Sequence, residues 1–294
     1  MVMPMGVCYG PYHQKDKAWS SYTSADIDAD MTIIKKYFHH IRTYSMRDAG
    51  KYIVGVASNH KVRVSLGVWI YKGDWNATKQ EIDTAIGQAV GFLGTVIHLV
   101  VGNEVNRREQ DYSTDEVMRA MNYAKQQVSS HSTLQGLDVT TCFSGTVLEP
   151  GTPGAAIWEP VVKACTSSVF LTVYPWYGNS PPGNIDGNMK WSYDNGIKQV
   201  EALGKDVIIG EIGWPSQGGR ATSVQNEELN YKVTDKWVRG GNFLKKNYLA
   251  FWFEMFDEPW KTQEGAFGPY WGLYGSGANP QEKFKIPVQV AMDA

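Results

Sequence analysis

The chain has 294 residues, 43% of them hydrophobic, and its 28 basic and 30 acidic side chains give a net charge of −2. This near balance excludes the strongly basic surface that nucleic acids and anionic membranes attract, so we expect neutral or small partners. No apolar run approaches the roughly 18 residues of a membrane-spanning helix, so we expect no membrane partner.

Strand-like and helix-like segments alternate along the chain at spacings of roughly 30 residues, which is typical of βα units around a parallel sheet. The strand-like segments are short and apolar, and they cover 5–10, 41–45, 63–70, 96–101, 139–143, 169–174, 207–211 and 249–256. Helices are predicted to begin near Ser24, Thr78 and Ser113, and to cover 157–165, 197–203 and 224–238. Thr78 with Glu81 and Ser113 with Glu116 each have the spacing of a capping box.

This alternation predicts the α/β class and a single (β/α)8 barrel, with residues 1–294 forming one catalytic domain. The alternative is an open, doubly wound sheet. The chain lacks the Gly-x-Gly-x-x-Gly turn that such a sheet carries after its first strand, and this favours the barrel.

Two of the predicted strands end in a glycine that precedes a glutamate. The strand at 96–101 is followed by Gly102, Asn103 and Glu104, and the strand at 207–211 ends in Gly210 and Glu211. Barrel active sites lie at the carboxyl ends of the strands, so we expect the fold to bring the two glutamates together. Further polar and aromatic residues lie at predicted strand ends, and they suit a sugar: Tyr9, Arg42, Tyr174, Trp176 and Glu258.

Paired carboxyls about 5 to 5.5 Å apart perform retaining glycoside chemistry, in which one is the nucleophile and the other is first acid and then base. The carboxylate next to Arg42 and a tyrosine hydroxyl should stay ionised, and its partner in a drier setting should keep a proton. We assign Glu211 as nucleophile and Glu104 as proton donor and base. Asn103 would offer its amide to the sugar 2-hydroxyl.

Four motifs make the resemblance to a known family specific. They are Gly6-Val7-Cys8-Tyr9-Gly10, Val101-Gly102-Asn103-Glu104-Val105, Glu211-Ile212-Gly213-Trp214-Pro215-Ser216 and Phe253-Glu254-Met255-Phe256-Asp257-Glu258. Together they resemble glycoside hydrolase family 17 over almost the whole chain, and the chain looks more like fungal members than plant ones. The resemblance implies a (β/α)8 fold, linear β-1,3-glucan as substrate and no cofactor. It also implies that Glu104 is the proton donor, that Glu211 is the nucleophile oriented by Tyr174, and that Glu258 and Lys261 lie near the cleft.

The covalent intermediate of a retaining enzyme can react with water or with a sugar hydroxyl, and a well-bound acceptor outcompetes water. We expect Trp158 and Glu159 to form an acceptor platform, with Trp176 as a further aromatic contact, and this favours a β-1,3-glucanosyltransferase. The alternatives are an endo-β-1,3-glucan hydrolase and a non-catalytic glucan-binding protein of the cell wall. The presence of both glutamates counts against the non-catalytic protein.

The remaining residues suggest no other chemistry. The six histidines lack the spacing of a metal site, so we expect no metal. Three cysteines, Cys8, Cys142 and Cys165, allow at most one intramolecular disulfide. We expect a monomer that is secreted or located in the cell wall, and residues 1–5 are too few for a leader, which would have been removed.

Overall fold

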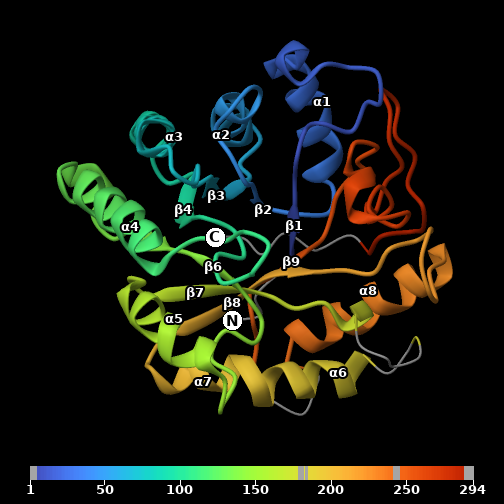
Figure 1. Ribbon diagram of the computed structural model, residues 1–294. Coiled ribbons are helices and arrows are strands. Elements are labelled where there is room, and N and C mark those ends of the chain that lie inside the picture. The colour runs from blue at the N-terminus through green and yellow to red at the C-terminus, as the bar shows by residue number, and fades with distance from the viewer. Residues whose placement is uncertain (1–4, 178–181, 183–184, 241–245, 288–294) are drawn as a thin grey trace.

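The computed structural model describes residues 5–177, 182, 185–240 and 246–287. Its strands are all parallel and form one sheet in the order β5-β4-β3-β2-β1-β9-β8-β7-β6. Helices surround this sheet (Figure 1). The predicted (β/α)8 barrel is confirmed.

The strands are β1 (Gly6–Cys8), β2 (His40–Arg42), β3 (Arg63–Val68), β4 (Val96–Val101), β5 (Asp138–Thr140), β6 (Cys142–Ser144), β7 (Ser168–Thr172), β8 (Asp206–Ile212) and β9 (Ala250–Trp252). The segment predicted as one strand at 139–143 is split into β5, which pairs with β4, and β6, which pairs with β7. Backbone bonds from Thr166 N to Val139 O and from Phe170 N to Thr141 O also join β5 to the β7 side. β5 and β6 therefore together take the place of the fifth strand of the barrel, and they close the sheet between β4 and β7.

The α-helices are α1 (Ser24–Ile34), α2 (Gly50–Asn59), α3 (Trp75–Gly91), α4 (Thr114–Ser129), α5 (Pro153–Ala164), α6 (Ile185–Ser192), α7 (Lys198–Ala202) and α8 (Val224–Val238). A π-helical turn, Tyr193–Ile197, joins α6 to α7. Short 3-10 turns complete the set: Trp19–Ser21, Ser132–Leu134, Pro175–Tyr177 and Lys261–Glu264. Among the described residues after β9, the short turn Lys261–Glu264 stands where the last helix of the barrel would begin.

The helix starts are partly as predicted. Ser113 and Glu116 form the expected capping box of α4. The box predicted at Thr78 and Glu81 is wrong, because α3 begins one turn earlier with Asp74 as its N-cap, whose side chain accepts from Ala77 N. Helix α2 was not predicted.

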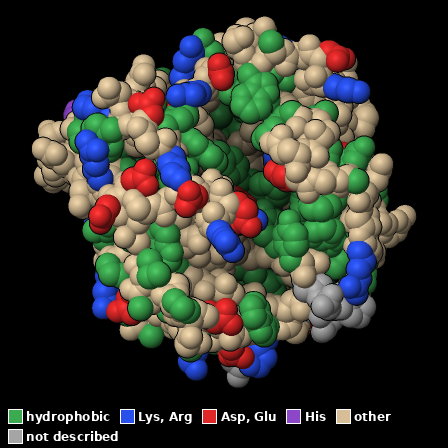
Figure 2. Space-filling model, viewed as in Figure 1, with side chains coloured by type: hydrophobic (Ala, Val, Ile, Leu, Met, Phe, Trp, Pro, Cys, Tyr) green, Lys and Arg blue, Asp and Glu red, His purple; other side chains and the backbone are tan. Residues whose placement is uncertain are grey.

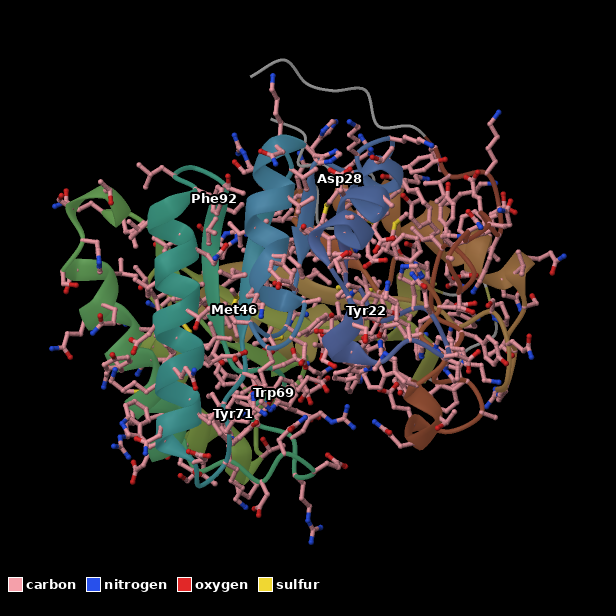
Figure 3. All side chains as sticks on the ribbon, turned by 90° about the horizontal axis from the view of Figure 1, so that it is seen from above. Tyr22, Asp28, Met46, Trp69, Tyr71 and Phe92 are labelled. Atoms are coloured by element: carbon pink, nitrogen blue, oxygen red, sulfur yellow. The ribbon has the colours of Figure 1, made fainter. Side chains whose placement is uncertain are left out.

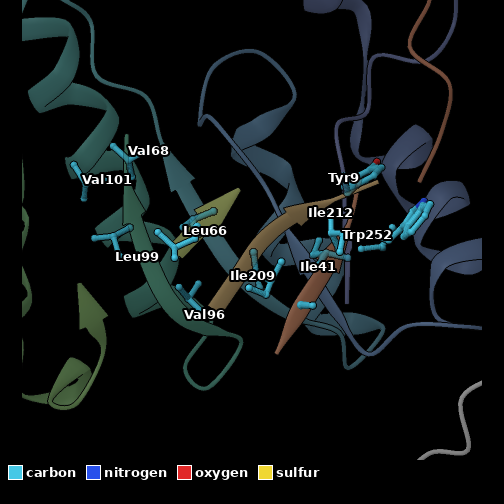
Figure 4. Close-up of a cluster of buried hydrophobic side chains, with 14 of the residues drawn as sticks. Tyr9, Ile41, Leu66, Val68, Val96, Leu99, Val101, Ile209, Ile212 and Trp252 are labelled. Carbon is cyan, nitrogen blue, oxygen red and sulfur yellow. The ribbon is translucent and has the colours of Figure 1, made fainter. Parts of the chain in front are cut away.

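Most of the hydrophobic core lies between the strands and the helices. Alternate strand residues point outward into this layer, among them Ile41, Leu66, Leu99, Ile209 and Trp252 (Figure 4). The intervening residues point into the barrel and form a second, smaller core: Cys8, Val100, Cys142, Phe170, Ile208, Leu249, Phe251, Phe253 and Trp271. Side chains that are neighbours along a strand therefore lie in different cores, one outside the sheet and one inside the barrel, because successive side chains of a strand point to opposite faces.

The two ends of the barrel differ in what they carry. Trp69 and Tyr71, which follow β3, lie at the opposite end from Phe92, which ends α3 (Figure 3). The face at the carboxyl ends of the strands is the one turned to the viewer in Figure 2. It is hollowed near its middle, with hydrophobic side chains on the walls and charged side chains of both signs around them.

Candidate active site

An irregularity in β8 turns Glu211 into the mouth of the barrel. Ile209 and Ile212 both point into the outer core, although strict alternation would place them on opposite faces. Across the strand pair, Leu171 is opposite Ile209 and Thr172 is opposite Glu211, so Gly210 is the extra residue of a β-bulge. Gly210 and Glu211 both occupy the inward side as a result.

Two side chains hold the carboxylate of Glu211. Arg42, from β2, donates from Nη1 to Oε1 over 2.7 Å, and the Tyr174 hydroxyl donates to Oε2 over 2.5 Å. Glu211 and Arg42 are both buried. Burial raises the pKa of the Tyr174 phenol well above its usual value, so this hydroxyl remains a donor.

Arg42 connects the two strands that carry the glutamates. Its Nη1 also donates to Gly210 O over 2.8 Å, and its Nη2 donates to Asn103 Oδ1 over 2.6 Å. Its guanidinium lies over the rings of Tyr44 and Phe170. Because Arg42 holds Asn103 by its carbonyl oxygen, the amide NH2 is the end of Asn103 that remains to meet a ligand.

Glu104 lies on a tight turn after β4. Gly102 has a φ of +84° and Glu104 itself a φ of +46°, and a Cβ at position 102 would come within 2.5 Å of Val105. Glu104 Oε1 accepts from Thr172 Oγ1 over 2.6 Å, and Oε2 accepts from Arg107 Nη1 over 2.8 Å. Burial, and then the charge of Glu211, raise the pKa of Glu104, against the opposing effects of Thr172 and Arg107.

A second group of charges lies beyond β9. Lys261 Nζ donates to both carboxylate oxygens of Glu254 at 2.7 Å and lies 2.7 Å from Glu258 Oε2. All three side chains are buried. Burial raises the pKa of Glu254 well above its ordinary range. A Cβ at Gly10 would come within 2.5 Å of Glu258 Oε1, so the loop after β1 packs directly against this group.

Aromatic rings pack beside Tyr174. Its ring has edge contacts with Phe253, Trp271 and Tyr177. Trp176 packs on Phe267 with ring centroids 4.5 Å apart, and its Nε1 donates to Arg220 O. Tyr177 is 62% exposed, so it presents a ring to solvent next to the residue that holds Glu211.

Three predicted binding residues are placed elsewhere. Tyr9 is 1% exposed, points into the outer core and donates its hydroxyl to Asp30 of α1 over 2.7 Å. Trp158 is 8% exposed and packs in α5 against Phe143, so it has no open face for a sugar. Glu159 is paired with Lys163 along the same helix. The prediction of an acceptor platform at 158 and 159 is therefore wrong.

Two residues that hold Glu104 were missed in the sequence. Thr172 lies two positions before Tyr174 on the same segment, so the strand period could have placed both on the inward face. Arg107 lies in a turn, and no periodic pattern indicates where its side chain points.

The described residues contain no group of three or more histidine, cysteine, aspartate or glutamate side chains that could hold a metal ion. Cys8, Cys142 and Cys165 are free and buried. In the part of the chain that the structure describes, no helix is both long and apolar enough to cross a membrane.

A pair of carboxyl groups is what most glycoside hydrolases use, and the mouth of a (β/α)8 barrel is where active sites of this fold lie. The chain belongs to the family described as the BtgE/BtgC glycoside hydrolase domain, whose model matches residues 6–272.

The chain is also similar to curated proteins in sequence and to solved structures in fold. The chain is 25% identical over 315 residues to the Aspergillus fumigatus protein named "Probable glucan endo-1,3-beta-glucosidase btgC", and the match covers 96% of this chain but only 43% of that protein. The fold is similar to an endo-laminarinase from Formosa (TM-score 0.78, 21% identity, 93% of this chain and 84% of that one). It is also similar to an active-site mutant of the Rhizomucor miehei β-1,3-glucanosyltransferase in complex with laminaritriose (TM-score 0.73, 23% identity, 96% and 97%).

Proposed function

We propose that this domain is a retaining β-1,3-glucan-active enzyme that cleaves the glucan and transfers the glucanosyl segment to an acceptor glucan. One observation carries the proposal. The carboxylate of Glu211 is held by a guanidinium and a phenol, while the neighbouring Glu104 has a pKa raised by burial and by the charge of Glu211. This is the division of labour that a nucleophile and an acid need.

In the first step, Glu211 attacks the anomeric carbon while Glu104 gives its proton to the glycosidic oxygen, and the bond to the leaving glucan breaks. In the second step, Glu104 takes a proton from an incoming hydroxyl, whose oxygen displaces Glu211 from the sugar. Arg42 and Tyr174 hold the carboxylate of Glu211 in place, and the amide of Asn103 would bind the sugar beside it.

The substrate class rests on the relatives and on the rings at the mouth. The names of the similar proteins refer to 1,3-β-glucosidase, laminarinase and 1,3-β-glucanosyltransferase activities. Tyr177, and the Trp176 and Phe267 rings beside it, offer apolar faces of the kind on which sugar rings stack. Lys261 and Glu258 would bind hydroxyl groups along the same chain.

Hydrolysis is the second candidate, and one observation favours it. Trp158 and Glu159 do not form an acceptor platform, so binding on the acceptor side would depend on other residues. We keep transfer as the main proposal because Tyr177 presents an exposed ring beside the catalytic pair.

A time course of products from a laminari-oligosaccharide of defined length distinguishes the two. Products longer than the starting sugar at early times support transfer. Shorter products alone, even at high substrate concentration, would assign the domain as a hydrolase. We further propose that the protein is a monomer, that it is secreted or located in the cell wall, and that it needs no cofactor.

Replacement of the nucleophile tests the whole scheme. Glu211→Ala should lower kcat by at least about 10³-fold, because no covalent intermediate can form, while laminaritriose binding measured by calorimetry is retained. Substantial turnover by this variant would mean that Glu211 is not the nucleophile. A folded wild-type protein that binds laminaritriose and never cleaves it would be a glucan-binding domain.

A further inference from the structure

The turn that follows Glu104 folds back so that a cation faces the carboxyl group. Arg107 N donates to Glu104 O over 2.9 Å and closes a four-residue turn, in which Glu104 has its left-handed φ. The same turn carries Arg107 Nη1 to Glu104 Oε2 at 2.8 Å. The ion pair is thus formed within the turn.

This turn is fastened to the neighbouring strand. Val105 is fully buried, and its N–H donates to Cys142 O over 3.0 Å. Asn106 and Ser144 exchange two bonds: Ser144 N donates to Asn106 Oδ1 over 2.8 Å, and Asn106 Nδ2 donates to Ser144 Oγ over 2.9 Å. Both residues between Glu104 and Arg107 are therefore anchored to β6. The backbone position of Arg107 is therefore set by the fold, whereas its side chain is 43% exposed.

The two oxygens of Glu104 differ in how open they are. Oε1 is held by Thr172, a buried strand residue that is 4% exposed. Oε2 is held by Arg107, whose side chain is 43% exposed. A sugar oxygen must come within about 2.6 to 3.2 Å of the carboxyl that protonates it, and it can approach only from the open side. It must therefore compete with Arg107 for Oε2.

Arg107 has a second anion within reach. Its Nε lies 3.4 Å from Glu109 Oε2, and the side chain of Glu109 is 72% exposed. A guanidinium that gives up Glu104 can stay paired at the rim of the mouth, so its release does not leave an isolated charge.

We propose that Arg107 is a removable counter-ion for Glu104, which occupies Oε2 while the leaving-group side is empty and yields that oxygen to the glycosidic oxygen when glucan binds there. This inference rests on the proposed function and adds a positioning residue to it. In the empty site Arg107 favours the ionised, base form of Glu104 and so opposes the burial and the Glu211 charge that raise its pKa. Withdrawal of Arg107 when the site is occupied removes this opposition and favours the protonated form that the first step needs. Acid catalysis would then be coupled to the presence of a leaving group.

Other groups also affect the pKa of Glu104, and a test of Arg107 must leave these side chains in place. The titratable and charged groups that face it from the surrounding elements are Cys142 on β6, Tyr174 and Tyr177 after β7, Glu211 on β8 and Glu264 after β9. Of these, Glu211 contributes most after burial itself. Substitution at position 107 replaces none of these side chains, although Arg107 also acts to lower the pKa of the Tyr177 phenol.

The test compares Arg107→Gln with Arg108→Gln, since Arg108 is the next residue of the loop and carries the same charge. In the free protein, the carboxyl of Glu104 is followed by carbon-13 NMR and identified by its loss in Glu104→Gln. Removal of a neighbouring cation raises the pKa of a carboxyl, and partial exposure of this pair reduces the effect to about half a unit to one unit. We expect this upward shift in Arg107→Gln and none in Arg108→Gln. An unchanged midpoint in Arg107→Gln would overturn the proposal, whether or not the domain acts on glucan.

Kinetics test the displacement. The basic limb of kcat/KM reports Glu104 in the free enzyme and should move upward in Arg107→Gln by the same amount. The basic limb of kcat reports the occupied site, from which Arg107 has withdrawn, and should stay in place. If both limbs move equally, Arg107 remains on Glu104 during the reaction and is not removable. If the wild type shows no turnover, the proposed function is wrong. The NMR titration would then still test whether Arg107 is the counter-ion of Glu104.

Discussion

At the scale of single residues, the candidate site depends on groups that are each held by more than one partner. Arg42 binds a carboxylate, an amide and a backbone carbonyl at once. Burying a guanidinium is costly, and these bonds, together with the ring of Phe170 beneath it, make the burial possible. The position of Glu211 therefore follows from that of Arg42.

Tyr174 offers a substitution that removes one bond to Glu211 and little volume. Tyr174→Phe should lower kcat by about 10- to 100-fold, the equivalent of one hydrogen bond to a charged group, with an unchanged melting profile. The measurement is kcat on a laminari-oligosaccharide. Tyr123→Phe is the matched control, because the Tyr123 hydroxyl also donates to a carboxylate, that of Asp83, outside the barrel. Equal losses in both variants would argue against a specific role for Tyr174.

At the scale of elements, the bulge in β8 decides which way the side chain of Glu211 points. Gly210 is the extra residue, and a Cβ there would lie 3.1 Å from Arg42 Nη1 and 3.2 Å from Phe170. β8 can therefore place residues 210 and 211 on the inward side together only if residue 210 is a glycine.

Gly210→Ala should push Arg42 away from Glu211 and lower kcat/KM by roughly 10- to 100-fold, since small displacements of catalytic groups have effects of this size. Gly87→Ala is the control: position 87 lies inside α3 with no atom within 4 Å of an added Cβ. That substitution should leave kcat/KM unchanged and raise stability by up to about 1 kcal/mol. Full activity in Gly210→Ala would show that the contact with Arg42 is not tight.

At the scale of the whole molecule, the interior of the barrel is a stack of layers. Glu211 and Glu104 lie at the mouth, Arg42 beneath them, and the stacked rings of Phe170 and Phe251 further in. The innermost layer is polar. Ser65 Oγ lies 3.1 Å from His40 Nε2 and 2.8 Å from His98 Nδ1.

This polar layer makes global stability depend on pH. Burial lowers the pKa of His98 to about 4 and that of His40 well below its ordinary 6.5. A group whose pKa is depressed in the folded state binds protons better when the chain is unfolded. The contribution of His40 and His98 to the free energy of unfolding is therefore complete above about pH 6.5 and is lost as the pH falls towards 4.

Urea denaturation should therefore show a free energy of unfolding that drops between pH 7 and pH 4.5, by on the order of 1 to 3 kcal/mol more in the wild type than in His98→Gln. His131→Gln, at the end of α4 on the outside of the barrel, should keep the wild-type slope. The same slope in all three proteins would mean that other groups cause the loss.

The sequence alone was enough to determine the barrel, because buried strands and amphipathic helices each have a period that shows in the order of residues. It also predicted that Glu104 and Glu211 lie close together, because a charge at the end of an apolar strand stands out, and the structure brings the two side chains into electrostatic contact. The strand period states that neighbouring side chains face opposite ways, but it does not state which one faces inward. Tyr9 was predicted at the mouth for this reason, whereas the phase of β1 turns Cys8 inward and Tyr9 towards α1.

Tertiary structure decided what no local pattern could. The bulge at Gly210 breaks the alternation that would have turned Glu211 away from the mouth, and it is visible only in the register between β7 and β8. Helix α5 buries Trp158, although a tryptophan in isolation suits a sugar platform equally well. The contact of Arg107 with Glu104 depends on a turn that is fastened to β6 by residues far away in the sequence. Local periodicity is set by bonds along the chain, while the direction of a single side chain at the mouth is set by pairing between strands, which the order of residues does not express.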